Sequence, residues 1–236
     1  MNPLDRSVNN TKQPAAILDA VRTLPPDWNA HGSFHRSVLD KLFVHALPRR
    51  NGASAETGTG KSTLLLSNLF QRHTVFALDD TGDGDSLLRV RESDLLLHER
   101  VQFVIGPTQQ TLPHHVFDSS LQFVLIDGPH GYPFPELEYY FFYPQLVPGG
   151  MMVIDDIQIP TIRHLFNVMR RDAMWRLVDV ERTTAFFERT DAPLFDPNGD
   201  GWWTQGYNIR HLSLRSRLGL MLPPAVKYSL QRILRQ

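Results

Sequence analysis

The segment Ala55–Thr63, AETGTGKST, places an acid, two glycines and a lysine close together, a combination that can hold a nucleotide. A phosphate-binding loop requires the pattern G-x-x-x-x-G-K-[ST]. Gly60–Ser62 fit the end of that pattern, but Ala55 stands where its first glycine should be. The tight turn that exposes backbone N–H groups to phosphate often relies on that glycine. The phosphate-loop interpretation is therefore the weaker of two.

The alternative places a short strand over Gly52–Glu56 and a turn over Thr57–Gly60. An acid followed by two glycines suits a ligand that has a cationic centre and a ribose but no triphosphate, because glycine lets the backbone approach closely. Arg49–Gly52, by contrast, lacks the Val, Ile and Leu expected of a buried parallel strand before a phosphate loop. We favour the strand-and-turn interpretation.

Acids follow four of the five central strands that the sequence predicts. They are Glu56 after 52–56, Asp79 after 75–78, Asp127 after 123–126 and Asp155 after 151–154. In open α/β sheets ligands bind outside the carboxyl ends of the strands, so these acids should line one crevice. Helix N-capping could account for one or two of them. Asp79 lies 19 residues after Gly60, close to the spacing of about 20 at which an acid commonly takes ribose hydroxyls.

The remaining elements alternate in a way that defines the fold class. A fifth central strand is expected at 101–105, helices at 17–24, 38–46 and 161–172, and a hairpin at 175–181 and 184–188. Strand–helix alternation predicts an α/β fold with a doubly wound, mostly parallel sheet. The hairpin makes it seven-stranded with an antiparallel C-terminal edge. We divide the chain into an N-terminal arm and helical lid (1–50), a cofactor-binding domain (51–190) and a basic C-terminal extension (191–236).

Two motifs carry a family resemblance: Asp127–Tyr132, DGPHGY, and the acid pair Asp155-Asp156. With the glycine turn, residues from about 35 to 190 resemble the class I methyltransferases that use S-adenosylmethionine, which have a Rossmann-like fold. The resemblance is to the subgroup with a D-G-x-H-x-Y element after strand four and a paired acid after strand five. That subgroup contains metal-dependent sugar and macrolide O-methyltransferases and relatives from cephalosporin biosynthesis.

The resemblance implies a role for each matching residue. The methionine part of the cofactor would be surrounded by Glu56, Gly58, Thr59, Gly60 and Ser62, its ribose held by Asp79 and its adenine contacted by Gln109. Asp127 would border the cofactor and, with Asp155 and Asp156, bind a divalent ion, Mg²⁺ or Mn²⁺. His130 would be the general base.

The chemistry accounts for these residue types. An acceptor hydroxyl must lose its proton as it attacks the methyl carbon, and a metal on carboxylates favours that loss. All-oxygen ligands suit a hard cation, and histidine suits proton transfer near neutral pH. Successive strand residues face opposite sides, so Asp155 and Asp156 can both ligate only if the strand ends between them. Asp155 is expected to be the surer ligand.

Composition narrows the class of protein further. The 236 residues carry a net charge of −1 and no cysteine, which argues against nucleic acid as a partner and excludes disulfides and thiolate metal sites. The polar start of the chain lacks the apolar region of a signal peptide, and no apolar run reaches membrane-spanning length. We expect a cytoplasmic enzyme, as a monomer or homodimer, that methylates a small hydroxylated molecule such as a sugar or glycoconjugate.

Two other functions stay open on the sequence. A P-loop NTPase or kinase would use Lys61 and Ser62 on phosphates and Asp127 or Asp155 on Mg²⁺. A non-catalytic cofactor-binding protein could share the same fold.

The C-terminal extension adds two weaker patterns. Residues 196–201 match the start of a calcium loop, but Tyr207 stands where the bidentate Glu should be, so we expect a turn. Residues 202–236 contain several Arg and Lys and no acid, with a helical apolar stripe over 226–234. We expect this tail to dock on its own domain or on a partner chain, with peripheral contact to an anionic membrane as the alternative.

Overall fold

The computed structural model describes residues 14–28, 33–79, 86–195 and 201–222. The expected arm at 1–13, Asp80, most of the calcium-like turn and the apolar stripe at 226–234 lie outside the described residues.

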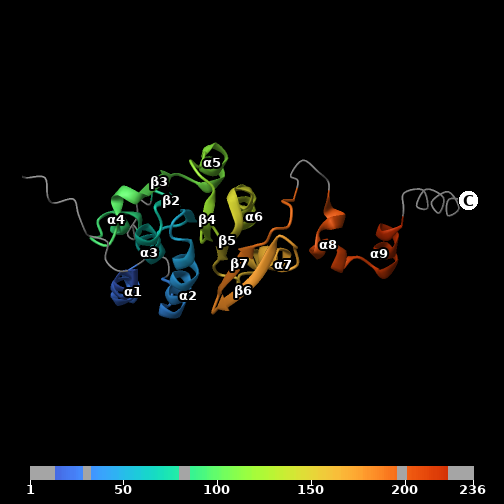
Figure 1. Cartoon of the computed structure of the whole chain (residues 1–236), viewed down its shortest axis with the longest axis horizontal. Coiled ribbons are helices and arrows are strands. Elements are labelled where there is room, and N and C mark those ends of the chain that lie inside the picture. The colour runs from blue at the N-terminus through green and yellow to red at the C-terminus, as the bar shows by residue number, and fades with distance from the viewer. Residues whose placement is uncertain (1–13, 29–32, 80–85, 196–200, 223–236) are drawn as a thin grey trace, which may run out of the picture.

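A single mixed sheet forms the centre of the molecule, with the strand order β3-β2-β1-β4-β5-β7-β6 (Figure 1). Strands β1 to β5 pair in parallel, whereas β7 is antiparallel to both β5 and β6. This arrangement confirms the predicted doubly wound sheet with an antiparallel C-terminal edge. The strands are β1 (Ala53–Thr57), β2 (Arg72–Ala77), β3 (Val101–Ile105), β4 (Leu121–Ile126), β5 (Leu146–Ile154), β6 (Trp175–Glu181) and β7 (Thr184–Arg189).

Strand β5 begins earlier than the sequence predicted. The turn expected at 147–150 lies within Leu146–Ile154. The pairing of β4 with β5 shifts register between Leu121 and Phe123, and Gly149 takes a φ of 79°. The Pro-Gly-Gly sequence therefore makes an irregularity inside the strand instead of ending it, because glycine supplies the positive φ that the distortion needs.

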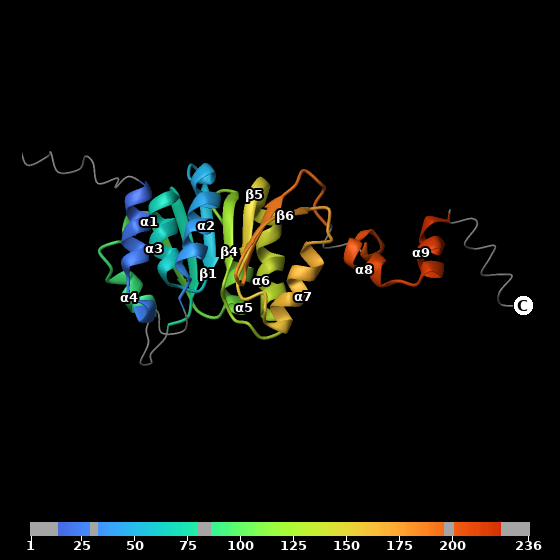
Figure 2. The same ribbon diagram turned by 90° about the horizontal axis from the view of Figure 1, so that it is seen from below.

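Alternate strand residues build two cores, one on each face of the sheet. Phe123, Leu125 and Val153 pack on one face, and Val124 and Ile154 on the other. The first face is covered by α1 (Pro14–Thr23), α2 (Arg36–Ala46), α3 (Lys61–Leu69) and α4 (Ser86–Arg91), and the second by α5 (Thr108–Thr111), α6 (Phe134–Phe142) and α7 (Pro160–Met169), as Figure 2 shows. Helices on both faces explain why the central strands are apolar along their whole length.

Helix α2 is fastened to the C-terminal hairpin, far away in the sequence. Three side-chain contacts run along the two elements, and each joins a polar or basic residue of the α2 segment to an acid of β6 or β7. They are Ser37 Oγ to Glu181 Oε1 (2.6 Å), Lys41 Nζ to Asp179 Oδ2 (2.7 Å) and Arg49 Nη2 to Glu188 Oε2 (2.9 Å). The N-terminal helices are thus held at the hairpin edge of the sheet as well as against α3.

The C-terminal extension consists, where described, of α8 (Gly206–His211) and α9 (Leu214–Met221), which lie beyond one end of the sheet in both views (Figures 1 and 2). Helix α8 contacts α7 through Tyr207, whose ring lies under the Arg171 guanidinium and beside His164. Leu214 and Leu218 of α9 are exposed. Docking of the tail on a partner or a membrane stays a prediction. None of the described helices is long and apolar enough to cross a membrane.

Lys61 joins the glycine turn to the N-terminal segment. Its side chain is buried, and Nζ donates to the carbonyl oxygens of Leu24 (3.1 Å) and Pro25 (2.8 Å), just beyond α1. The lysine that made the turn resemble a phosphate loop therefore binds main-chain oxygens of its own chain.

We expect Lys61→Met to lower the free energy of unfolding by about 2 kcal/mol, because two buried carbonyls lose a charged hydrogen-bond donor. Urea unfolding measures the change. Arg50→Met is the control, because Arg50 is exposed and should change stability by less than about 0.5 kcal/mol. A loss for Lys61→Met no larger than that of the control would contradict the structural role.

Candidate functional site

A cavity of about 1160 Å³ opens at the carboxyl ends of the parallel strands. Pockets for one small ligand usually measure about 300–1,000 Å³, so this space can hold a cofactor together with an acceptor. Its wall comes from the N-terminal helices, from the loops after β1, β3, β4 and β5, and from the β6–β7 turn. The site thus lies where the strand-end acids predicted it.

Gly58 shapes the cavity wall after β1. It takes a φ of 86°, and its N–H donates to the carbonyl oxygen of Phe76 on β2 (2.9 Å). A Cβ at this position would lie 2.5 Å from the backbone oxygen of Asp127. Both the positive φ and the close approach of two backbones require glycine here. The turn can therefore present its main chain to a ligand without a side chain in the way.

The residues predicted to bind the cofactor fall into two groups. Gly58, Thr59, Gln109 and Asp127 line the cavity. Four others are not among the lining residues: Glu56, Gly60 and Ser62, which are buried, and Asp79, which is exposed two residues after β2. The structure does not bring these four to the cavity wall.

Glu56 supports the turn from beneath. It lies on the α3 side of β1, where it accepts hydrogen bonds from the Thr63 hydroxyl and from His73 Nε2 (3.2 Å), and the other ring nitrogen of His73 lies 2.8 Å from Ser54 Oγ. Gly60 donates its N–H to Thr63 Oγ1 (3.1 Å), so the same hydroxyl ties the turn to Glu56. The sequence analysis did not single out His73, since nothing in the sequence marks a histidine within a strand as a partner of Glu56.

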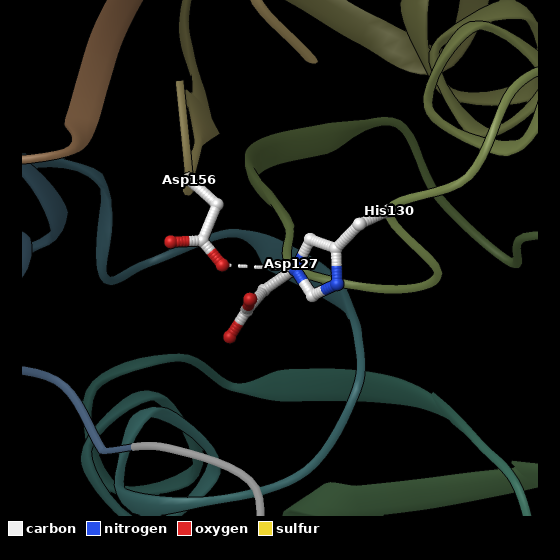
Figure 3. A group of neighbouring side chains, drawn as sticks. All are labelled: Asp127, His130 and Asp156. Carbon is white, nitrogen blue, oxygen red and sulfur yellow. Dashed lines mark ion pairs between the residues drawn. The ribbon is translucent and has the colours of Figure 1, made fainter. Parts of the chain in front are cut away.

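Asp127, His130 and Asp156 form a compact group on the cavity wall (Figure 3). Each offers one ligand atom, and these atoms all lie within 4.8 Å of one another. His130 Nε2 is 2.9 Å from Asp156 Oδ2, and 44% of the histidine side chain is exposed. The Thr161 hydroxyl, at the start of α7, donates to the His130 carbonyl oxygen (2.5 Å) and fixes this loop.

Asp155 and Asp156 point to different partners. Strand β5 ends at Ile154, and Asp156 has a φ of 55°, a conformation that Asp tolerates better than most residues. The backbone change sends Asp156 toward His130, whereas Asp155 Oδ1 accepts a hydrogen bond from Thr184 Oγ1 (2.5 Å). The expectation that Asp155 is the surer ligand therefore finds no support in the geometry, because Asp155 lies outside the group that Asp156 joins.

The acids at this edge repel one another in a desolvated place. Burial raises the pKa of Asp127 well above its ordinary value, and the charges of Asp155 and Asp156 raise it further. Burial also raises the pKa of Asp155, against the hydrogen bond from Thr184. A site that concentrates negative charge in this way is electrostatically complementary to a cation.

A buried acid that the sequence did not reveal positions Asp127. Glu138 of α6 is fully buried, and its Oε2 accepts from Thr57 Oγ1 (2.8 Å), which in turn accepts from the Asp127 N–H (3.1 Å). Burial raises the pKa of Glu138 to about 7, against the hydrogen bond from Thr57. The only sequence signal was an acid within the apolar helix FPELEYYFF.

Comparisons with known proteins agree with this architecture. Residues 55–157 match the family model described as a methyltransferase domain. No curated protein sequence matches the chain.

Solved structures share the fold at low sequence identity. The O-methyltransferase from Bacillus cereus in complex with S-adenosylhomocysteine is 12% identical, with a TM-score of 0.57 over 80% of this chain and 94% of that one. The O-methyltransferase TomG from Streptomyces achromogenes, in complex with S-adenosylmethionine, is 14% identical, with a TM-score of 0.55 over 79% and 92%. The S-adenosylhomocysteine-bound methyltransferase PaMTH1 from Podospora anserina is 13% identical, with a TM-score of 0.54 over 78% and 89%.

The fold and the match identify a class I methyltransferase, the class that uses S-adenosylmethionine. Its methyltransferase domain contains the glycine turn after β1, the Asp127–His130 loop and the acid pair after β5, all within residues 55–157.

We expect Glu138 to make stability fall with pH. The folded chain keeps the carboxyl proton up to about pH 7, whereas the unfolded chain releases it near 4.5, so unfolding releases a proton between these values. The free energy of unfolding should drop by about 3 kcal/mol from pH 5 to pH 8 on this account.

Glu138→Gln cannot ionise and should remove that part of the drop, which urea unfolding at the two pH values measures. Glu99→Gln, at an exposed position, serves as the control and should leave the drop unchanged. An equal pH dependence in the Glu138→Gln variant and the unmodified protein would show that Glu138 is already ionised in the fold.

Proposed function

We propose that the protein transfers a methyl group from S-adenosylmethionine to a hydroxyl of a small acceptor, with a divalent cation at Asp127 and Asp156. The grouping of Asp127, His130 and Asp156 inside a cavity that also borders the glycine turn carries this proposal. It brings a proton acceptor and cation ligands to the place where cofactor and acceptor would meet.

The cofactor fits the turn after β1. Gly58 leaves its backbone accessible, and Thr59 and Gln109 offer polar groups to the same space. In class I methyltransferases, as the resemblance implies, the methionine part lies against the β1 turn and the adenine beside the loop after β3. Gln109 lies on that second loop, in α5. The buried pair Glu56 and Thr63 would hold the turn in shape.

The donor set suits a hard divalent cation. Two carboxylates and an imidazole on one cavity wall match the oxygen-rich ligation of Mg²⁺ and Mn²⁺, and no thiolate is available in the chain. Bound there, the cation would supply charge stabilisation to an acceptor oxygen, and S-adenosylmethionine would supply an electrophilic methyl carbon. Asp156 is already oriented, because Gln158 Nε2 donates to its Oδ1 (2.7 Å).

His130 would receive the proton of the acceptor hydroxyl. The carbon–oxygen bond forms as the carbon–sulfur bond breaks, so the proton must leave the oxygen for a base in the site. Asp156 holds the imidazole and would stabilise its protonated form. The surrounding wall holds both reactants close together, which supplies much of the rate in a two-substrate transfer.

A phosphate-transfer function has less support from the same residues. Lys61 Nζ is occupied by two main-chain carbonyls, and the turn that would cradle phosphate begins with a buried alanine, Ala55.

Calorimetric titration with S-adenosylhomocysteine and, separately, with ATP–Mg²⁺ tests the cofactor. Saturable binding of S-adenosylhomocysteine alone is expected. Gly58→Ala should weaken that binding roughly tenfold or more, because it forces an unfavourable φ and a backbone clash. Gly219→Ala is the matched control, since a Cβ there meets nothing within 4 Å. Binding of ATP alone would overturn the proposal.

Mn²⁺ titration followed by electron paramagnetic resonance tests the metal. Asp127→Asn and Asp156→Asn should each weaken Mn²⁺ binding by roughly tenfold or more, and Asp155→Asn should weaken it less. His130→Gln separates two roles: loss of a base lowers methyl transfer at unchanged Mn²⁺ affinity, whereas loss of a ligand lowers both. Equal losses for Asp155→Asn and Asp156→Asn would show that both acids ligate.

A further inference from the structure

Two arginines on the cavity wall have no acidic partner among the described residues. Arg36 is the first residue of α2, Arg182 lies in the β6–β7 turn, and both side chains are exposed. The other two cations of the wall are engaged, since Arg22 pairs with Asp19 and Asp40 and Lys61 binds main-chain carbonyls. The cavity therefore combines a group of acids with a pair of cations available to a ligand.

The fold holds the two arginines at the same place. Ser37 Oγ donates to Glu181 Oε1 at 2.6 Å, and these residues are the chain neighbours of Arg36 and Arg182. One turn further along α2, Lys41 pairs with Asp179 of the same strand at 2.7 Å. The start of α2 and the hairpin turn thus form one continuous piece of the wall.

The hairpin turn is also locked to the loop that carries the acids. The Ile157 N–H donates to the Thr183 carbonyl oxygen at 2.9 Å, so the residues that follow Asp156 and Arg182 are joined. Arg182 has a φ of 55°, as does Asp156, and a non-glycine residue in that conformation persists only when its surroundings enforce it. The position of the arginine relative to the acid group is therefore fixed by the backbone.

The strand order separates these arginines from the cofactor turn. The glycine turn follows β1, the acids follow β4 and β5, and the hairpin of Arg182 lies beyond β5 in the order β1-β4-β5-β7-β6. The reacting group therefore lies between the two. Arg36 and Arg182 also lie outside residues 55–157, the segment that matches the methyltransferase family model. Both observations place the arginines on the side of the acceptor.

We propose that Arg36 and Arg182 bind an anionic group of the acceptor, a carboxylate or phosphate, while its hydroxyl lies at Asp127, His130 and Asp156. The inference rests on the proposed function and narrows its substrates to hydroxylated anions. Guanidinium groups bind carboxylate and phosphate through paired, charge-assisted hydrogen bonds, which fixes orientation as well as charge. An acceptor anchored in this way would present one hydroxyl to the acid group.

The test uses the full chain loaded with S-adenosylhomocysteine and two matched pairs of probes, glucose 6-phosphate with glucose and 3,4-dihydroxybenzoate with 3,4-dihydroxybenzamide. Calorimetry should show an anion binding roughly tenfold or more tightly than its neutral counterpart. Arg36→Gln and Arg182→Gln should remove that preference. Arg50→Gln, at an exposed position outside the cavity wall, should keep it.

Side-chain NMR of ¹⁵N-arginine protein titrated with inorganic phosphate gives a readout that does not depend on the choice of acceptor. The Nε–H signals of Arg36 and Arg182 should shift together, and that of Arg50 should stay in place. Absence of these shifts, or an anion preference that survives both variants, would overturn the inference. So would a tenfold loss of S-adenosylhomocysteine affinity in either variant, since the arginines would then bind the cofactor carboxylate.

The two proposals fail in different ways. If the unmodified protein does not bind S-adenosylhomocysteine, the proposed function fails. If it binds S-adenosylhomocysteine but neither arginine responds to phosphate, only the anionic acceptor is rejected.

Discussion

The parallel pairing of β1 with β4 is the constraint on which the site depends. It places Thr57 opposite Ile126, so that the glycine turn and the Asp127 loop leave the sheet side by side. Gly58 allows the two backbones to approach, and the Thr57 hydroxyl links the Asp127 N–H to the buried carboxyl of Glu138. The proposed cofactor turn and the acid group therefore share one rigid origin, and a change at either should be felt by the other.

Burial of polar groups around this origin carries an energetic cost that the hydrogen bonds only partly offset. Glu56 and Glu138 flank β1 on its two faces, each within a network of hydroxyl groups. Oε2 of Glu56 and Oε1 of Glu138 have no hydrogen-bond partner among the described residues. Buried, partly satisfied carboxyls destabilise a fold, and such groups are concentrated at functional sites. Here they hold the main chain of the cavity wall in place.

The sequence predicted the fold and the edge of the sheet that carries the site, because both follow from local patterns. Apolar runs ending in acids identify parallel strands, and the carboxyl ends of parallel strands lie at one edge. The choice between Asp155 and Asp156 depended on one backbone dihedral at the end of β5, which side-chain types do not reveal. Glu138 and His73 act through partners distant in the sequence, and the arginine pair exists only because α2 packs against the hairpin.

The left-handed backbone at Asp156 and Arg182 implies a conflict between endurance and turnover. A non-glycine residue in that conformation costs about 1–3 kcal/mol, and glycine would remove most of the cost. Laboratory evolution that rewards survival at high temperature but not catalysis should therefore accumulate glycine or asparagine at these two positions. Lineages that must also keep their catalyst working should retain the aspartate and the arginine, and find their extra stability elsewhere in the sheet and its helices.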